Sequence, residues 1–266
     1  MRSLKRVKVR RERASFPALV IAFLVFSIVF YLTAVSVQTE KAIESSTAKN
    51  AKSTREIEIE KAEYYLISLC ESDKPETVRL NAARNMQRGA AGYLFEKEGR
   101  YYSVGNVYFS KTEAEKMIAH LTKGGMDAKV ISVSSKGVTL RVTADQAVLD
   151  AAEFAARAFS EWEKSMMDIS KRIDRGDLSG REACVLLSVL AYDLGKERST
   201  AEAVSSGAQD HAVKRMMDVY LHMLDQTALL TKNEGGEGKL SARIKHAAIA
   251  HVQKRISMCD DFLNQN

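Results

Sequence analysis

The sequence predicts an α+β protein with three parts: an N-terminal transmembrane helix, a small βαββαβ domain with a four-stranded sheet, and an all-α four-helix bundle. Residues 14–39 contain no charged side chain, and residues 62–133 contain one pattern twice. After residue 143 the apolar residues recur with helical spacing to the end of the chain. We therefore divide the chain into a basic tail, a membrane helix, a polar stalk, a βαββαβ domain with one additional strand, and a bundle: residues 1–13, 14–37, 38–61, 62–143 and 144–266.

The positive charge of the chain is concentrated at its N-terminus. The formal net charge is +6 over 266 residues, and residues 1–13 contain seven basic side chains and one acid. The other residues carry 33 bases and 33 acids. Because this larger part is neutral, it offers no general basic surface for phosphates, and we expect no nucleic acid as a partner.

The uncharged stretch between Phe16 and Val37 is long enough to cross a membrane. As a helix it spans about 30 Å of hydrocarbon at about 1.5 Å per residue. The basic residues before it predict a single-pass protein of the cell membrane, with a cytoplasmic N-terminus and the bulk of the chain extracytoplasmic. A cleaved signal peptide, with a cleavage site at Ala34-Val35-Ser36, is the alternative. The polar residues 38–61 are expected to form a stalk or a frayed helix.

Residues 62–133 repeat a strand, a helix and a strand. The pair Tyr64-Tyr65 recurs as Tyr101-Tyr102, and Gly89 recurs as Gly125, at offsets of 37 and 36 residues. This spacing predicts a duplicated βαβ unit. Both helices must bury their apolar stripes on the same small sheet, so we expect the other face of the sheet to be bare.

Local signals locate the elements of this unit. Pro75 favours a helix start and Gly89 a helix end, while Ser110 begins a capping box that ends at Glu113. The dipeptide Glu98-Gly99 indicates a hairpin turn between two strands.

The rest of the chain predicts one more strand and then four helices. Residues 138–142 alternate apolar and polar side chains. Capping boxes that begin at Thr143, Ser179 and Ser199 indicate three helix starts, and the loop at 233–239 precedes the fourth helix. Short connections favour an up-and-down bundle.

Residues 62–133 resemble the SPOR domain family, the sporulation-related repeat of bacterial envelope proteins. The resemblance rests on the repeated unit, on the βαββαβ order, and on the aromatic ends of Tyr102–Tyr108. It implies that the bare sheet face binds peptidoglycan glycan strands, and that one membrane helix anchors the protein. In the first strand, Ser68 and Cys70 stand where the family usually has Gln and Gly.

A glycan site needs aromatic faces for sugar C–H surfaces, together with hydroxyl or amide partners. If Ile67 and Leu69 face the helices, strand alternation turns Tyr64, Ser68 and Cys70 outward. The alternative is that these tyrosines belong to the edge of the core. The candidate glycan-binding residues are Tyr64, Ser68, Tyr93, Tyr101, Ser103 and Asn106.

No sequence motif indicates catalysis or a metal site. The five histidines form no HExxH pattern, and no pair of acidic residues has a spacing that indicates acid–base chemistry. We therefore expect no catalytic residues, no metal and no cofactor, and classify the protein as a non-enzyme. Cys184 and Cys259 are expected to be buried on bundle helices, and a disulfide between them is the alternative.

Two functions follow from these features. The first is a membrane-anchored bacterial envelope protein that binds glycan strands and helps to localise itself to a division or sporulation septum. Its bundle would dock an unknown envelope or divisome protein. The alternative is a non-enzymatic membrane scaffold that forms protein–protein contacts without glycan binding. An envelope hydrolase is disfavoured because no catalytic constellation is visible.

Overall fold

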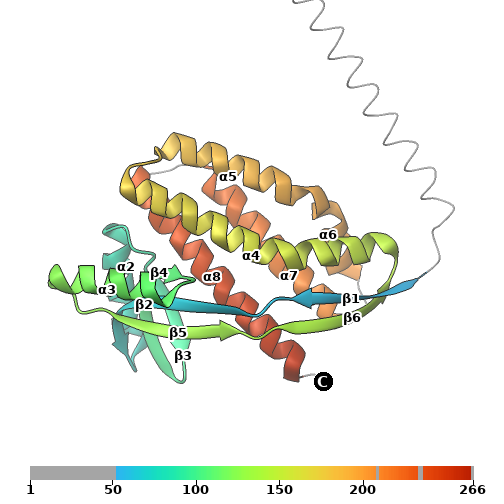
Figure 1. Cartoon of the computed structure of the whole chain (residues 1–266), viewed down its shortest axis with the longest axis horizontal. Helices are drawn as coiled ribbons and strands as arrows, with labels where there is room; N and C mark the ends of the chain where they lie inside the picture. Colours follow the sequence, from blue (N-terminus) through green and yellow to red (C-terminus); the bar gives the residue numbers. More distant parts are fainter. Residues whose placement is uncertain (1–51, 208–209, 233–235, 265–266) are drawn as a thin grey trace, which may run out of the picture. The chain divides into compact units, whose positions relative to one another are not determined.

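The structure is a computed structural model that describes residues 52–207, 210–232 and 236–264. Residues 52–266 form one compact unit. It is an α+β fold with two antiparallel sheets and a set of helices packed against them (Figure 1). The predicted basic tail, the predicted membrane helix and the first part of the predicted stalk lie outside the described residues.

The larger sheet has four strands in the order β3-β4-β2-β5, all antiparallel. The elements that form it and connect its strands follow the predicted βαββαβ order: β2 (Ala62–Ser72), α2 (Pro75–Gln87), β3 (Tyr93–Lys97), β4 (Arg100–Tyr108), α3 (Lys111–Lys123) and β5 (Lys129–Ser135). The turn between β3 and β4 is the predicted one. Glu98 and Gly99 have φ angles of 53° and 73°, the left-handed pair that a tight hairpin requires.

Strand β2 and strand β4 are each interrupted by one unpaired residue. Ile67 pairs with Asn106 and Ser68 pairs with Val104, so Gly105 has no partner on β2. The register shifts again between Ser68 and Cys70, which leaves residue 69 without a partner on β4. Two such bulges next to each other restore the register but change the face to which neighbouring side chains point.

The smaller sheet pairs β1 (Ser53–Ile59) with β6 (Val138–Ala144). The prediction of a stalk over residues 38–61 is wrong for this part, because residues 53–59 form a strand. Alternation along β1 puts Ile57 and Ile59 on one side, and both are buried. Strand β1 therefore contributes an apolar face to the core, although its sequence is rich in charged residues.

The remaining residues form helices: α4 (Gln146–Arg175), α5 (Gly180–Leu194), α6 (Arg198–Gly207), α7 (His211–Leu230) and α8 (Glu237–Asn264), with a 3-10 turn (Gly195–Glu197) before α6. The capping box at Ser179 is present, with both of its hydrogen bonds to Glu182. Thr143 instead lies in β6, and Ser199 lies inside α6. The predicted third helix is divided into α6 and α7, and the Asp210 side chain caps the start of α7.

The predicted fold class is wrong in how it arranges the sheet and the helices relative to each other. Helices α2 and α3 pack on one face of the four-stranded sheet, and α8 packs against β3, β4 and β5 from the other side. No face of the sheet is left bare, because Tyr64, Leu66, Val104 and Val107 make that second face apolar and it packs on the helices. The helices are thus not a separate four-helix bundle.

The predicted fold class also included an N-terminal transmembrane helix. Across the residues that the structure describes, no helix combines the length and the apolar character that a membrane crossing requires. The predicted span itself, residues 14–37, lies outside those residues.

Candidate functional site

Three of the predicted glycan-binding residues point to the sheet face that the C-terminal helices cover. Tyr64 is 0% exposed and donates a hydrogen bond to Glu163 on α4. Tyr93 donates one to Gln253 on α8 at 2.7 Å. Ser68 is buried, and its hydroxyl donates to the carbonyl oxygen of Cys70. These groups therefore already have partners inside the protein.

The other three predicted residues do not join this set. Ser103 is buried and accepts a hydrogen bond from Asn85 on α2, which lies on the opposite face of the sheet. Asn106 is half-buried and donates to the Tyr108 hydroxyl at 3.1 Å. Tyr101 is half-buried near the end of β4. The structure thus places the predicted set on two opposite faces and does not bring it together as one surface.

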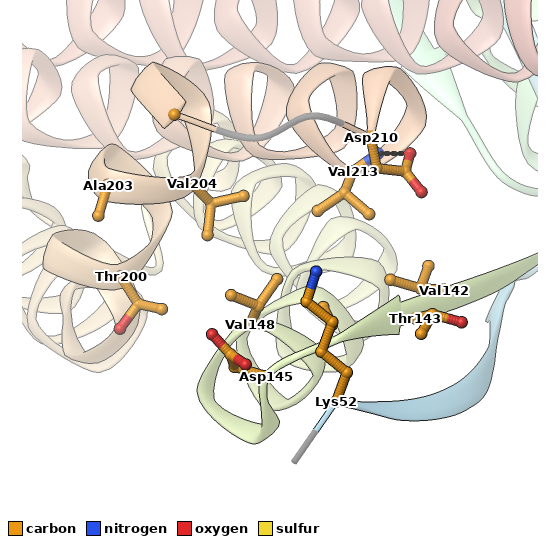
Figure 2. Close-up of a pocket in the computed structure, with 12 residues that line it drawn as sticks. Lys52, Val142, Thr143, Asp145, Val148, Thr200, Ala203, Val204, Asp210 and Val213 are labelled. Carbon is orange, nitrogen blue, oxygen red and sulfur yellow. Dashed lines mark hydrogen bonds between the residues drawn. The ribbon is translucent and has the colours of Figure 1, made fainter. Parts of the chain in front are cut away.

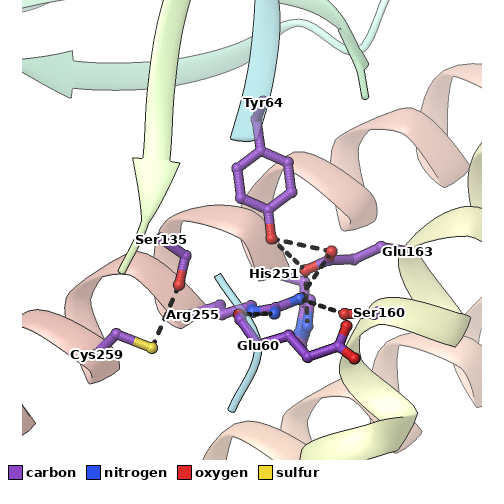
Figure 3. Close-up of polar contacts among 8 residues, drawn as sticks. All are labelled: Glu60, Tyr64, Ser135, Ser160, Glu163, His251, Arg255 and Cys259. Atoms are coloured by element: carbon purple, nitrogen blue, oxygen red, sulfur yellow. Dashed lines mark hydrogen bonds and ion pairs between the residues drawn. The ribbon is translucent and has the colours of Figure 1, made fainter. Parts of the chain in front are cut away.

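A buried polar cluster lies where β2, α4 and α8 meet (Figure 3). Arg255 donates to Glu163 at 3.1 Å, to Ser160 at 3.0 Å and to the carbonyl oxygen of Glu60 at 2.7 Å. Glu163 also accepts from Tyr64, with oxygen–oxygen distances of 3.1 and 3.0 Å. Burial raises the pKa of the Glu163 carboxyl, and the Arg255 guanidinium and the Tyr64 hydroxyl oppose that rise.

His251 is part of the same cluster but makes no hydrogen bond to any described residue. Its ring packs against Trp162 and Phe159, with centroid distances of 4.9 and 5.3 Å. Its Nε2 atom lies 3.4 Å from Glu163. Burial and the nearby Arg255 charge lower the pKa of His251 to about 3, so the imidazole is neutral at pH 7.

Glu163 and Arg255 are not among the predicted site residues, although the sequence contains a signal for both. Glu163 follows Trp162 on the inward stripe of α4, and Arg255 lies on the inward stripe of α8 with His251 and Cys259. Charged residues at inward positions of amphipathic helices predict a buried pair. Both residues are buried, so the cluster joins the sheet to the helices and is not exposed to solvent.

Cys184 and Cys259 are free thiols, although the sequence also allowed a disulfide between them. Cys184 is half-buried and Cys259 is buried, and neither forms a disulfide. Cys259 accepts a hydrogen bond from Ser135 at 3.3 Å. Within the described ranges, no group of three or more His, Cys, Asp or Glu side chains is placed to hold a metal ion.

A pocket of about 500 Å³ lies between β6, the start of α4, α6 and α7 (Figure 2). Its floor contains Val142, Val204 and Val213, which are buried. Lys52 and Asp145 are exposed at its edge. It is an open groove, and none of its charged side chains is buried.

Helix α5 carries the most extended apolar surface that the described residues expose. Val185, Val189 and Tyr192 are 60%, 54% and 74% exposed. Their spacing of four and three residues puts them on one side of the helix. A groove of about 460 Å³ lies beside this stripe, between α4 and α5. It shares Val189 with the stripe, and half-buried Leu186 and Leu190 line it. We name the stripe and this groove together the α5 surface.

Both ends of the α5 surface carry charged side chains. Arg181 lies at the N-terminal end of the helix and Asp193 at the C-terminal end, where Asp193 pairs with exposed Lys196 at 2.8 Å. Exposed apolar side chains in a continuous stripe with a polar rim are typical of a protein interaction site. The α5 surface is therefore the candidate functional site.

Comparison with known proteins assigns the chain to no family. No family model matches it, and no curated protein and no solved structure shows detectable similarity to it. The resemblance to the SPOR domain family stays a prediction from the sequence, and the function of this chain has to be argued from its own geometry.

Proposed function

We propose that this protein is a non-enzymatic scaffold that forms protein–protein contacts through the α5 surface. The observation that carries this proposal is the exposed stripe of Val185, Val189 and Tyr192. Burying such side chains against another protein contributes roughly 25 cal/mol for each Å² of apolar surface. The Tyr192 ring adds a large contact area whose hydroxyl can stay at the rim.

The partner that the charges of this surface fit is a second copy of the chain. Two α5 helices that run antiparallel about a two-fold axis level with Leu187 put Val185 opposite Val189 of the second copy. The same axis puts Arg181 opposite Asp193 of the second copy, where it would share the carboxylate with Lys196 of that copy. A self-complementary patch of this kind is what a two-fold dimer requires.

The expected association is weak. One helix and its groove bury less than the about 1,600 Å² of a standard interface, so we expect a dissociation constant in the micromolar range. Confinement of both copies to one membrane, which the sequence predicts from residues 14–37, would raise their effective concentration.

Sedimentation of the full-length chain at increasing concentration tests the proposal. Val189→Asp should abolish the dimer, because it buries an unpaired carboxylate in the interface. Leu80→Asp is the matched control, because Leu80 is 65% exposed on α2 and lies away from α5. A monomer at all concentrations, or equal loss of dimer in both variants, would contradict the proposal.

Glycan binding is a separate prediction from the resemblance, and its support is weaker. Tyr64 and Tyr93 have hydrogen-bond partners inside the protein, which favours the scaffold. Pulldown of the full-length chain by purified sacculi, with and without amidase treatment, distinguishes the two functions. Retention that rises after treatment would support glycan binding, and retention that does not change would count against it.

A further inference from the structure

A second cavity lies under α2 and α3, at the point where the β2–β4 ladder is interrupted. Its volume is about 270 Å³. Its walls include Leu69 and Gly105, the two bulge residues, together with Met117 and Leu121 from α3. Bulges occur preferentially next to functional sites, where they change the direction of a side chain.

The bulges also keep this cavity open. A β-carbon on Gly105 would lie 2.7 Å from the Leu69 side chain, so a larger residue would push Leu69. Because Gly105 has no side chain, Leu69 packs over the backbone of β4 and forms one apolar wall. The cavity thus depends on a glycine at this position.

One end of the cavity carries charge. Lys245 reaches it from α8 and is only 6% exposed. The Lys245 ammonium donates to the carbonyl oxygen of Gly89 at 2.9 Å and pairs with Asp174 at 2.7 Å. An ammonium has three protons, so one donor has no partner among the described residues.

Arg88 lies at the same end of the cavity and adds a second positive charge. It forms no ion pair with any residue in the described part of the chain. Asp174 supplies one negative charge, and its other carboxylate oxygen accepts from Ser241 at 2.6 Å. Lys245 and Arg88 against Asp174 leave one net positive charge beside an apolar cavity.

We propose that this cavity binds a small amphipathic monocarboxylate, such as a medium-chain acyl anion. The carboxylate lies at Lys245 and Arg88, and the hydrocarbon chain extends between Leu69, Met117 and Leu121. A volume of 270 Å³ equals the liquid volume of roughly nine water molecules at about 30 Å³ each, so the ligand is limited to a chain of about six carbons. The apolar walls and the single net charge favour such a ligand over a sugar or a polyanion.

A photoreactive carboxylate tests this site in the full-length chain. The probe is a five-carbon carboxylate with a diazirine next to its methyl end, and mass spectrometry locates the adducts. We expect adducts on Met117 or Leu121, and competition by hexanoate. The alcohol with the same chain and diazirine should label this site about tenfold less, because it lacks the charge that the Lys245 and Arg88 end recognises.

Arg88→Gln isolates the charge contribution without disturbing the core, because Arg88 is exposed. We expect labelling of Met117 or Leu121 to fall about fivefold, a modest effect because solvent screens an exposed charge. Arg84→Gln on the same helix is the matched control and should label as the unaltered chain does. Adducts elsewhere, equal labelling by the alcohol, or an equal effect of both variants would overturn the proposal.

Discussion

Tyr64 on β2 donates its hydroxyl hydrogen to the buried carboxylate of Glu163 on α4, 99 residues later in the chain. Both side chains are buried, and Arg255 on α8 neutralises the carboxylate. Three elements from the two predicted domains therefore meet at one ion pair (Figure 3). This contact explains why the sheet and the helices form one compact unit.

Removing the Tyr64 hydroxyl should weaken that connection. Tyr64→Phe keeps the ring and deletes a hydrogen bond to a charged group, so we expect the free energy of unfolding to fall by about 1.5–3 kcal/mol. Urea denaturation measures it. The control is Tyr65→Phe, whose hydroxyl makes an exposed hydrogen bond to Glu63 and should contribute less than about 0.5 kcal/mol. Equal losses in the two variants would show that the Tyr64 contact has no special weight.

Removing one partner of the Glu163–Arg255 ion pair should lower the free energy of unfolding more than removing both partners. Arg255→Met leaves the Glu163 carboxylate buried and unpaired, and we expect a loss of about 3–5 kcal/mol in unfolding free energy. The double variant Glu163→Gln, Arg255→Met removes the orphaned charge and should recover part of that loss. Arg198→Met, in an exposed pair with Asp225, serves as the control and should cost less than about 1 kcal/mol. A double variant that is less stable than Arg255→Met would refute this account.

His251 should make the protein sensitive to acid. Its pKa is about 3 in the folded chain against an ordinary value of 6.5. Below pH 6.5 the unfolded chain binds a proton that the folded chain does not accept until about pH 3. The unfolding free energy therefore decreases as the pH falls through this range, by up to about 1.4 kcal/mol per pH unit.

His251→Leu should remove that part of the acid sensitivity. The raised pKa of Glu163 acts with the opposite sign, but Glu163 is present in both proteins, so the comparison isolates the imidazole. Urea denaturation at pH 7, 6, 5 and 4 measures the slope. His120→Leu, on the exposed side of α3, is the control and should keep the original slope. A variant His251→Leu with an unchanged slope would exclude this histidine as the cause.

The start of α7, after the end of α6, should depend on the N-cap residue Asp210. Asp210 accepts hydrogen bonds from the backbone N–H groups of Ala212 and Val213 at 2.9 and 3.1 Å, and Figure 2 shows the one from Val213. Asp210→Ala should lower the unfolding free energy by about 1 kcal/mol. Asp145→Ala is a close control, because Asp145 occupies the same position before α4 without a side-chain cap. Thermal unfolding measures both, and equal shifts in melting temperature would contradict the assignment.

Local signals predicted much of the secondary structure correctly. The positive φ angles at Glu98 and Gly99, the capping box at Ser179 and the helix end at Gly89 all lie where short-range chemistry requires them. The helical spacing of apolar residues that was predicted after residue 143 is present in α4, where Phe159 and Trp162 are buried. Each of these features depends on residues within a few positions of one another.

The candidate glycan site was less predictable because it depended on register. Alternation correctly predicted that Tyr64 and Ile67 point to opposite faces of the sheet. The bulges at residue 69 and Gly105 then changed the faces to which the residues beyond them point. Cys70, which was expected to face outward, accepts a contact from Asn81 on α2 at 3.4 Å. Unpaired strand residues leave no regular pattern in a single strand, so alternation cannot detect them.

The sequence alone determined the α+β class, the order of the strands and helices around residues 62–143, and the helical character of the chain after them. Those properties follow from local periodicity and turn chemistry. Only the tertiary structure decided that α8 covers the second face of the sheet, that Glu163 and Arg255 meet, and that the α5 surface stays exposed. The period of the apolar residues shows that a face must be buried, but it carries no information about which distant element packs against it.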